Sequence, residues 1–269
     1  MLRVGVLGAG GRMGREVCRA VIADPELDLA AAVDPALAGI DLRQVTGTDS
    51  GGLQVGSDIG DLERASADVA VDFTVAEAAL ENLQWCAAHS VHAVVGTTGL
   101  VEGDVSRLDG LFSRSPANCV LAPNFAIGAA LMIRFAELAA PFMDGAEIIE
   151  LHHAGKVDAP SGTAMSTAER IDVARVESGS APWPADRTAR TVLDGVRGGA
   201  AAGGVRVHSV RLNGLVAHQE VIFGAVGQSL TIRHDAYDRT SFMPGVLLAV
   251  KAVPGRPGLT LGLGPLLGF

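Results

Sequence analysis

The sequence predicts an α/β fold in two domains. Short apolar strands alternate with amphipathic helices as far as residue 125, which is typical of parallel βαβ units. A glycine-rich turn follows the first strand, as in many such units. Beyond residue 140, longer strands follow one another through glycine-containing turns. We therefore expect a parallel sheet first and then a central α+β domain with a mixed, largely antiparallel, open sheet.

The elements of the first part can be assigned in order. The expected strands are 3–7, 27–33, 69–73, 92–95 and 118–122. The expected helices are 11–23, 76–89 and 102–113. Residues 35–60 are rich in Gly and Asp and show no clear periodicity. We expect them to form a variable crossover.

The second part begins with a helix over 127–140. The strands expected after it are 147–153, 205–212, 215–223 and 229–234, with a helix over 163–175. Residues 178–204 read as a long loop, which a compact domain tolerates for a reason such as a subunit contact or a lid. A helix over 241–250 and a short strand over 259–263 are expected to rejoin the first domain. The domains are thus 1–126 completed by 241–269, and 127–240.

Composition excludes several classes of protein. With 269 residues, 48% of them hydrophobic, the chain can bury a large core. A net charge of -9 argues against a nucleic-acid partner. No signal peptide and no membrane span is evident, so we expect a cytoplasmic protein with no membrane partner. Cys18, Cys86 and Cys119 are scattered in apolar settings and fit reduced structural thiols, with no metal-binding spacing.

The glycine-rich turn predicts a dinucleotide site. Glycines let the backbone approach a pyrophosphate, and the following helix N-terminus favours an anion. The G-x-G-x-x-G pattern is imperfect because Met13 takes the third glycine position, but Gly8, Gly11 and Gly14 complete a G-x-x-G-x-x-G pattern. The candidate cofactor-binding residues here are Gly8, Ala9, Gly10, Gly11, Arg12 and Met13.

Asp34 ends the second expected strand, where a carboxylate can accept hydrogen bonds from the ribose hydroxyls of the cofactor. Pro35 follows where a basic residue would suit a 2′-phosphate, which favours NADH. Arg12 or Arg43 could still serve NADPH, so the expected cofactor is NADH or NADPH. A turn-forming Asp-Pro pair is an equally good explanation of Asp34 taken alone.

Three further segments follow expected strands at their carboxyl ends, the edge at which open parallel sheets bind ligands. Each could be ordinary loop chemistry, but three in succession after the glycine turn indicate a cofactor crevice. The candidate cofactor-binding residues in these segments are Phe73, Gly96, Thr97, Thr98, Ala122, Pro123, Asn124 and Phe125.

Residues 151–164 carry the strongest chemical signal. His152, His153 and Lys156 crowd three potential cations into one loop, and Ser161-Gly162-Thr163 opens a helix whose free N–H groups favour a carboxylate. The pattern indicates an acid/base centre beside an anion cradle. Each residue alone would more often be a satisfied polar group at a sheet edge, with Ser161 only an N-cap. A zinc site is disfavoured, because adjacent histidines on a strand point to opposite faces.

With these residues in view, the chain closely resembles the 4-hydroxy-tetrahydrodipicolinate reductases, formerly called dihydrodipicolinate reductases, of bacterial lysine and diaminopimelate biosynthesis. The resemblance covers nearly the whole chain apart from 35–60 and 178–204. The segments that carry it are 8–14, 96–98, 122–125, 150–164 and 233–245.

This resemblance implies a Rossmann-like dinucleotide-binding domain, a central substrate-binding and oligomerisation domain, and a homotetramer. It implies hydride transfer from NADH or NADPH to a small dicarboxylate substrate, with loss of water. His152 would be the catalytic acid/base and Lys156 a proton donor or cationic stabiliser. The substrate contacts would be His153, Ser161, Gly162 and Thr163.

Two alternatives stay open on the residues alone. The first is another two-domain NAD(P)-dependent reductase, such as a semialdehyde dehydrogenase. Semialdehyde dehydrogenase chemistry needs a reactive cysteine, and none of the three cysteines qualifies. A dinucleotide-sensing regulator would keep the glycine turn without turnover, and the intact His152 and Lys156 argue against it.

Overall fold

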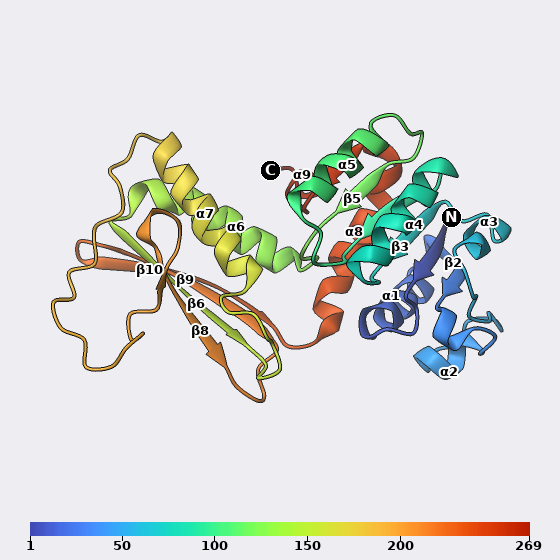
Figure 1. Cartoon of the computed structure of the whole chain (residues 1–269), viewed down its shortest axis with the longest axis horizontal. Coiled ribbons are helices and arrows are strands. Elements are labelled where there is room, and N and C mark those ends of the chain that lie inside the picture. The colour runs from blue at the N-terminus through green and yellow to red at the C-terminus, as the bar shows by residue number, and fades with distance from the viewer. The chain divides into compact units, whose positions relative to one another are not determined.

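The computed structural model describes all residues from Met1 to Phe269 and divides into two compact units (Figure 1). The first unit comprises Met1–Ile127 and Phe242–Phe269, and the second comprises Gly128–Ser241. None of the helices combines the length and the apolar character needed to cross a membrane.

A six-stranded parallel sheet forms the centre of the first unit. Its strands, in the order β11-β5-β4-β3-β1-β2, are β11 (Leu259–Leu261), β5 (Cys119–Leu121), β4 (His92–Val95), β3 (Val69–Asp72), β1 (Leu2–Leu7) and β2 (Leu27–Val33). The inner strands β3 and β5 are buried along their length because helices cover both faces, which explains their continuous apolar runs. The C-terminal tail returns to this sheet through β11, as the sequence predicted.

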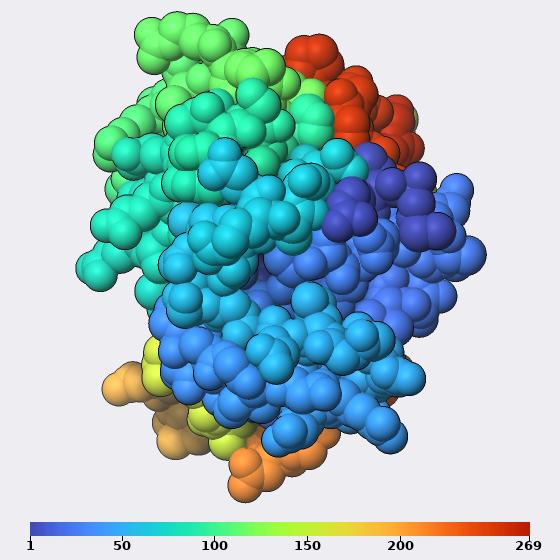
Figure 2. Space-filling model, turned by 90° about the vertical axis from the view of Figure 1, so that its right-hand side faces the viewer, coloured from blue at the N-terminus to red at the C-terminus, as the bar shows by residue number.

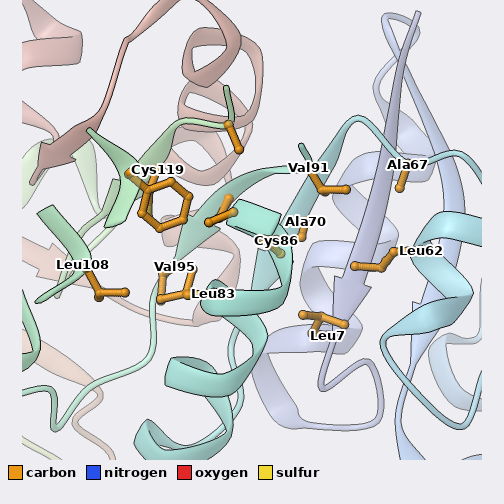
Figure 3. Packing of buried hydrophobic residues seen from close by; sticks show 14 of the residues in the cluster. Leu7, Leu62, Ala67, Ala70, Leu83, Cys86, Val91, Val95, Leu108 and Cys119 are labelled. Carbon is orange, nitrogen blue, oxygen red and sulfur yellow. The ribbon is translucent and has the colours of Figure 1, made fainter. Parts of the chain in front are cut away.

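Helices pack on both faces of this sheet, and they are α1 (Arg12–Ala23), α4 (Ala76–Ala88), α5 (Glu102–Phe112) and α8 (Met243–Ala252). In α1 the buried residues are Gly14, Val17, Cys18 and Val21, which recur at helical spacing. The core under α4 and α5 combines residues such as Leu83, Leu108 and Val95 (Figure 3). After α8, the short helical segments η5 (Val253–Gly255) and α9 (Gly264–Leu267) belong to the C-terminal part of this unit, and η4 (Arg239–Phe242) lies at the boundary between the units.

The crossover from 35 to 60 is more regular than expected. It contains η1 (Pro35–Leu37) and α2 (Leu42–Thr46), and α3 (Gly60–Arg64) begins at its end. Asp34 and Asp41 cap η1 and α2 by accepting hydrogen bonds from backbone N–H groups two residues further on. Helices this short show no apolar periodicity in the sequence. This region forms much of the surface facing the viewer in Figure 2.

The second unit is built on a five-stranded mixed sheet, as predicted. Its strands, in the order β10-β9-β6-β8-β7, are β10 (Gln228–Ala236), β9 (Ala217–Ala225), β6 (Gly145–His152), β8 (Arg206–Arg211) and β7 (Gly199–Ala200). The pair of β6 and β8 is parallel and the other pairs are antiparallel. The strand ends differ from the predicted ones by a few residues, because hydrogen bonding rather than side-chain alternation ends a strand.

One face of this sheet packs against α6 (Ile127–Ala139), α7 (Gly162–Glu177) and η2 (Ala140–Phe142) (Figure 1). Ile148, Val221 and Phe223 lie in the core between them. The register places Ile149 and Ile222 on the opposite face. Both side chains are partly exposed there.

The expected long loop after α7 is present, with only β7 and η3 (Ala202–Gly204) as regular structure. It is anchored by Trp183, whose side chain joins the core. The guanidinium of Arg175 lies 4.2 Å from the centre of the Trp183 ring. Arg175 also donates hydrogen bonds to the carbonyl oxygens of Ala140 and Met143. The first part of the loop is therefore fixed to the C-terminal end of α7.

Candidate active site

Five polar or glycine-rich segments meet at the carboxyl edge of the parallel sheet. Because β1, β2, β3, β4 and β5 are parallel and adjacent, the residues that follow them lie along one edge. These residues include every predicted cofactor residue, at positions 8–13, 34, 73, 96–98 and 122–125. The sheet thus gathers the predicted cofactor residues, which are far apart in sequence.

The glycine turn is packed too tightly for side chains. Gly8 has φ +75°, a conformation that favours glycine. A Cβ on Gly14 would lie 2.0 Å from the carbonyl oxygen of Gly8. Gly11 caps α1 without a side chain, and the N–H groups of Arg12 and Met13 have no acceptor in the chain. Free N–H groups behind a glycine-rich turn fit a dinucleotide pyrophosphate.

Asp34 is joined to this turn. Its Oδ2 accepts a hydrogen bond of 2.9 Å from the N–H of Gly10, and its Oδ1 accepts one of 3.1 Å from Ala36. The carboxylate is therefore held at the end of β2 beside the glycines, where ribose hydroxyls would be met. The turn-forming role and the cofactor role proposed for Asp34 are compatible. Oδ2 accepts from Gly10 and Oδ1 from Ala36, and each carboxylate oxygen can accept a second hydrogen bond.

Phe73 and Gly96 fit together at the next strand ends. A Cβ on Gly96 would lie 2.0 Å from an atom of the Phe73 ring, so that ring can lie there only over a glycine. The same ring lies 5.8 Å from the Phe125 ring, centre to centre. Asn124 Oδ1 accepts a hydrogen bond from Ala126 and shapes the turn that carries Phe125.

Asp72, which the sequence analysis did not select, ties these loops together. Its buried carboxylate accepts hydrogen bonds from the Thr74 hydroxyl at 2.6 Å, the Asn82 amide at 2.8 Å and the Thr97 hydroxyl at 3.2 Å. Thr97 is therefore an internal support, whereas Thr98 is exposed at the edge.

In the second unit, His152 ends β6 and pairs with a buried carboxylate. Its Nδ1 lies 2.5 Å from Oε2 of Glu150, whose side chain is fully buried. Burial lowers the pKa of His152, and the nearby Lys156 and Arg211 act in the same direction, so that Glu150 only partly offsets them. His152 is thus a weakly basic imidazole with one nitrogen already committed.

Lys156 and His153 occupy the loop after β6. The Lys156 ammonium donates to both oxygens of Asp158, at 2.7 and 2.8 Å. The His153 side chain is exposed, while its carbonyl oxygen accepts a hydrogen bond from the Lys156 N–H. Both side chains therefore belong to the same short loop that follows His152.

The start of α7 completes this group. Ser161 is the N-cap, and its hydroxyl accepts a hydrogen bond from the N–H of Ala164. The N–H groups of Gly162 and Thr163 have no acceptor in the chain. Because α7 is a long helix, its positive end reinforces the attraction of these groups for a carboxylate.

Sequence reasoning missed Glu150 and Arg211. Both oxygens of Glu150 accept hydrogen bonds of 2.8 Å from the Arg211 guanidinium. Arg211 comes from β8 and is the register partner of His152. Glu150 had a local signal, since it lies in an apolar strand two residues before His152 and hence on the same face. Arg211 had none.

Other chemistries lack support in these side chains. No group of three His, Cys, Asp or Glu side chains is arranged to hold a metal ion. All three cysteines are buried, and burial raises the pKa of Cys18 and of Cys86 to about 12. Neither of these two thiols resembles an activated nucleophile.

Comparison with known families gives one match to the N-terminal part of the chain and one to the C-terminal part. Residues 2–125 match the model of the N-terminal part of dihydrodipicolinate reductase, and residues 128–267 match that of its C-terminal part. The chain belongs to the dihydrodipicolinate reductase family. It is therefore an oxidoreductase of lysine and diaminopimelate biosynthesis that uses NADH or NADPH.

Similar proteins include two full-length relatives named 4-hydroxy-tetrahydrodipicolinate reductase. The protein of Cutibacterium acnes is 51% identical, with all of both chains covered. That of Nocardia farcinica is 52% identical, with 99% of this chain and 98% of the relative covered. A solved dihydrodipicolinate reductase from Paenisporosarcina sp. TG-14, bound to dipicolinate, superposes with a TM-score of 0.84 at 37% identity. The superposition covers 98% of this chain and 99% of the chain of that relative.

Proposed function

We propose that this protein reduces 4-hydroxy-tetrahydrodipicolinate to tetrahydrodipicolinate, with the first unit binding the dinucleotide and the second binding the substrate. The observation that carries the proposal is the grouping of His152, Lys156 and the free N–H groups of Gly162 and Thr163. An acid, a cation and an anion cradle are the groups that reduction of a dicarboxylate imine requires.

The cofactor would lie at the carboxyl edge of the parallel sheet. The free N–H groups after Gly11 would hold the pyrophosphate, and Asp34 would accept hydrogen bonds from the ribose. When bound, NADH or NADPH supplies the hydride. The contacts toward its nicotinamide end would come from the loops at Phe73, 96–98 and 122–125.

The dicarboxylate would lie against the start of α7. One carboxylate would accept hydrogen bonds from Gly162 and Thr163, with Ser161 shaping the turn. Lys156 and His153 would supply donors and positive charge. The relative with bound dipicolinate, a flat pyridine dicarboxylate, supports a site for such ligands in this family.

His152 would supply the proton. Overall the reaction consumes a hydride and a proton and releases water. As the hydride adds to the conjugated ring, an electron pair moves onto the imine system and must be protonated. The His152 nitrogen that does not face Glu150 is the atom available for this transfer. Lys156 would stabilise the negative charge that develops before protonation.

The experiment that tests this function compares His152→Gln and Lys156→Met with the unchanged protein. We expect turnover to fall by about 10²–10⁴-fold in His152→Gln, the usual contribution of a general acid. NADH binding, followed by fluorescence, should stay nearly unchanged, because both residues lie outside the first unit. Turnover close to that of the unchanged protein in either variant would remove that residue from the mechanism.

The second unit would also join copies of the chain into a homotetramer. The sheet face opposite α6 and α7 carries partly exposed Ile149, Leu151 and Ile222, which a partner's sheet could cover. Ile222→Glu should lower the mass measured by light scattering, whereas Val173→Glu, at an exposed position of α7 away from this face, should leave it unchanged. An unchanged mass in Ile222→Glu would place the interface elsewhere.

We also place the reaction in the cytoplasm.

A further inference from the structure

Glu150 is the junction of the substrate-side residues. It lies in β6 two positions before His152, so both side chains point to the face covered by α7. One oxygen faces His152 Nδ1 at 2.5 Å, and the other accepts a hydrogen bond of 3.2 Å from the N–H of Ser161. A single carboxylate therefore contacts both the proposed acid and the cap of the proposed cradle.

Arg211 fixes this carboxylate in place. Its two terminal nitrogens donate to the two oxygens of Glu150 at 2.8 Å each. One of these nitrogens also donates to the carbonyl oxygen of Asp158 at 2.6 Å, which links the clamp to the Lys156 loop. The pKa of Glu150 lies below its usual range, because hydrogen bonds led by that from Arg211 outweigh the effect of burial.

The charge of Glu150 decides which nitrogen of His152 carries a proton. An ionised carboxylate only accepts hydrogen bonds, so the nitrogen that faces it must be protonated. In neutral His152 the proton then lies on Nδ1, and Nε2 is free to take up and release a second one.

We propose that Glu150 is a positioning residue that holds His152 in this tautomer, and that Arg211 and the N–H of Ser161 keep the carboxylate in place. The inference rests on the proposed function of His152. It adds the reason why Nε2 gives the proton to the substrate, namely that Glu150 keeps a proton on Nδ1, and it makes Glu150 the link between the acid and the cradle.

The charged groups around His152 come from three segments. Glu150 lies on β6, Arg211 on β8, and Lys156 with Asp158 on the following loop. The positions in register on β9 are Gln219 beside Glu150 and Ala217 beside His152, and neither titrates. With the carboxylate replaced, the remaining Arg211 and Lys156 charges would make His152 harder to protonate.

A direct test reads the tautomer by nitrogen NMR on protein labelled at histidine, with the His152 signal assigned from its loss in His152→Gln. We expect the proton on Nδ1 and none on Nε2 at a pH where the ring is neutral. The opposite tautomer in the unchanged protein would overturn the proposal, whatever the activity of the variants.

The kinetic test uses Glu150→Gln, which keeps the shape of the side chain. We expect kcat to fall by about 10- to 100-fold, part of the usual contribution of a general acid. The basic limb of the pH profile should move to lower pH by about one unit. In a His152→Gln background the same change should have little further effect on kcat. A Glu150→Gln enzyme with unchanged kcat and pH profile contradicts the positioning role.

Glu147→Gln is the matched control. Glu147 lies on the same strand and also pairs with an arginine, Arg197, and with a histidine, His208, at 2.8 Å, but on the opposite face. The Glu147→Gln variant should leave the nitrogen NMR signal of His152 and the pH profile of the enzyme unchanged. If Glu150→Gln does not fold because Arg211 is left unpaired, Glu150→Gln/Arg211→Gln removes both charges and permits the same measurements.

Two failures can be told apart. If His152→Gln retains turnover, the proposed function of His152 fails and the positioning role fails with it. If His152→Gln loses turnover while Glu150→Gln changes neither kcat nor the pH profile, only the positioning role is lost.

Discussion

The ammonium of Lys156 is held by Asp158, with Nζ 2.7 and 2.8 Å from the two carboxylate oxygens. The cation proposed to meet the substrate therefore already has an internal carboxylate partner. A dicarboxylate that binds to Lys156 must compete with Asp158 for the ammonium. About half of the Asp158 side chain is exposed, so its ion pair with Lys156 is weak and the competition costs little.

Asp158→Asn should strengthen inhibition by pyridine-2,6-dicarboxylate, because the competing charge is removed and the shape is kept. We expect the inhibition constant to fall by up to about fivefold, since an exposed ion pair contributes at most about 1 kcal/mol. Inhibition should be competitive with the substrate, and Lys156→Met should weaken it. Non-competitive inhibition would place the dicarboxylate site elsewhere.

The pH dependence of the unchanged enzyme should reflect the lowered pKa of His152. The proposed acid works only when protonated, and burial makes it lose its proton below the ordinary value of 6.5. The value of kcat/KM, which reports the free enzyme, should therefore decline as the pH rises, with an apparent pKa below 6.5. His152→Gln should remove this limb. A decline that begins only above pH 7.5 would mean that another group sets it.

Gly14→Ala should weaken cofactor binding. The new Cβ would lie 2.0 Å from Gly8 O and 2.9 Å from Ala9 Cα, so the glycine turn must move. We expect the Kd for NADH to rise by about tenfold or more, since a misplaced turn loses hydrogen bonds to the pyrophosphate. Gly103→Ala is the control, because its Cβ in α5 would meet no atom within 4 Å. Equal Kd values for the two variants would argue against a pyrophosphate at this turn.

Asp34 should decide the balance between the two cofactors. Its carboxylate favours ribose hydroxyls and repels a 2′-phosphate, and Pro35 supplies no compensating charge, so NADH should be used at least as well as NADPH. Asp34→Asn keeps the acceptor for the Gly10 N–H and removes the charge. The ratio of kcat/KM for NADPH to that for NADH should rise by about tenfold. A strong preference of the unchanged enzyme for NADPH would show that Arg12 or Arg43 overrides Asp34.

Local patterns predicted most of the elements. The alternation of buried strands such as β3 with amphipathic helices such as α1 depends on residues that are close in sequence, and so does the turn at Gly8. The helices α2 and α3 escaped prediction because five residues are too few for a helical period. The two-residue strand β7 escaped because its partner β8 alone makes it a strand.

The sequence by itself determined at which edge of the first sheet the cofactor candidates lie, since each group of candidates directly follows one of the parallel strands. It also placed His152, Lys156 and the start of α7 within one short segment. Only the tertiary structure decided what surrounds His152. Arg211 reaches Glu150 from a strand 61 residues away, and the pairing of β6 with β8 brings it there. Strand register depends on the packing of a whole sheet face rather than on any local pattern, which is why this contact could not be predicted.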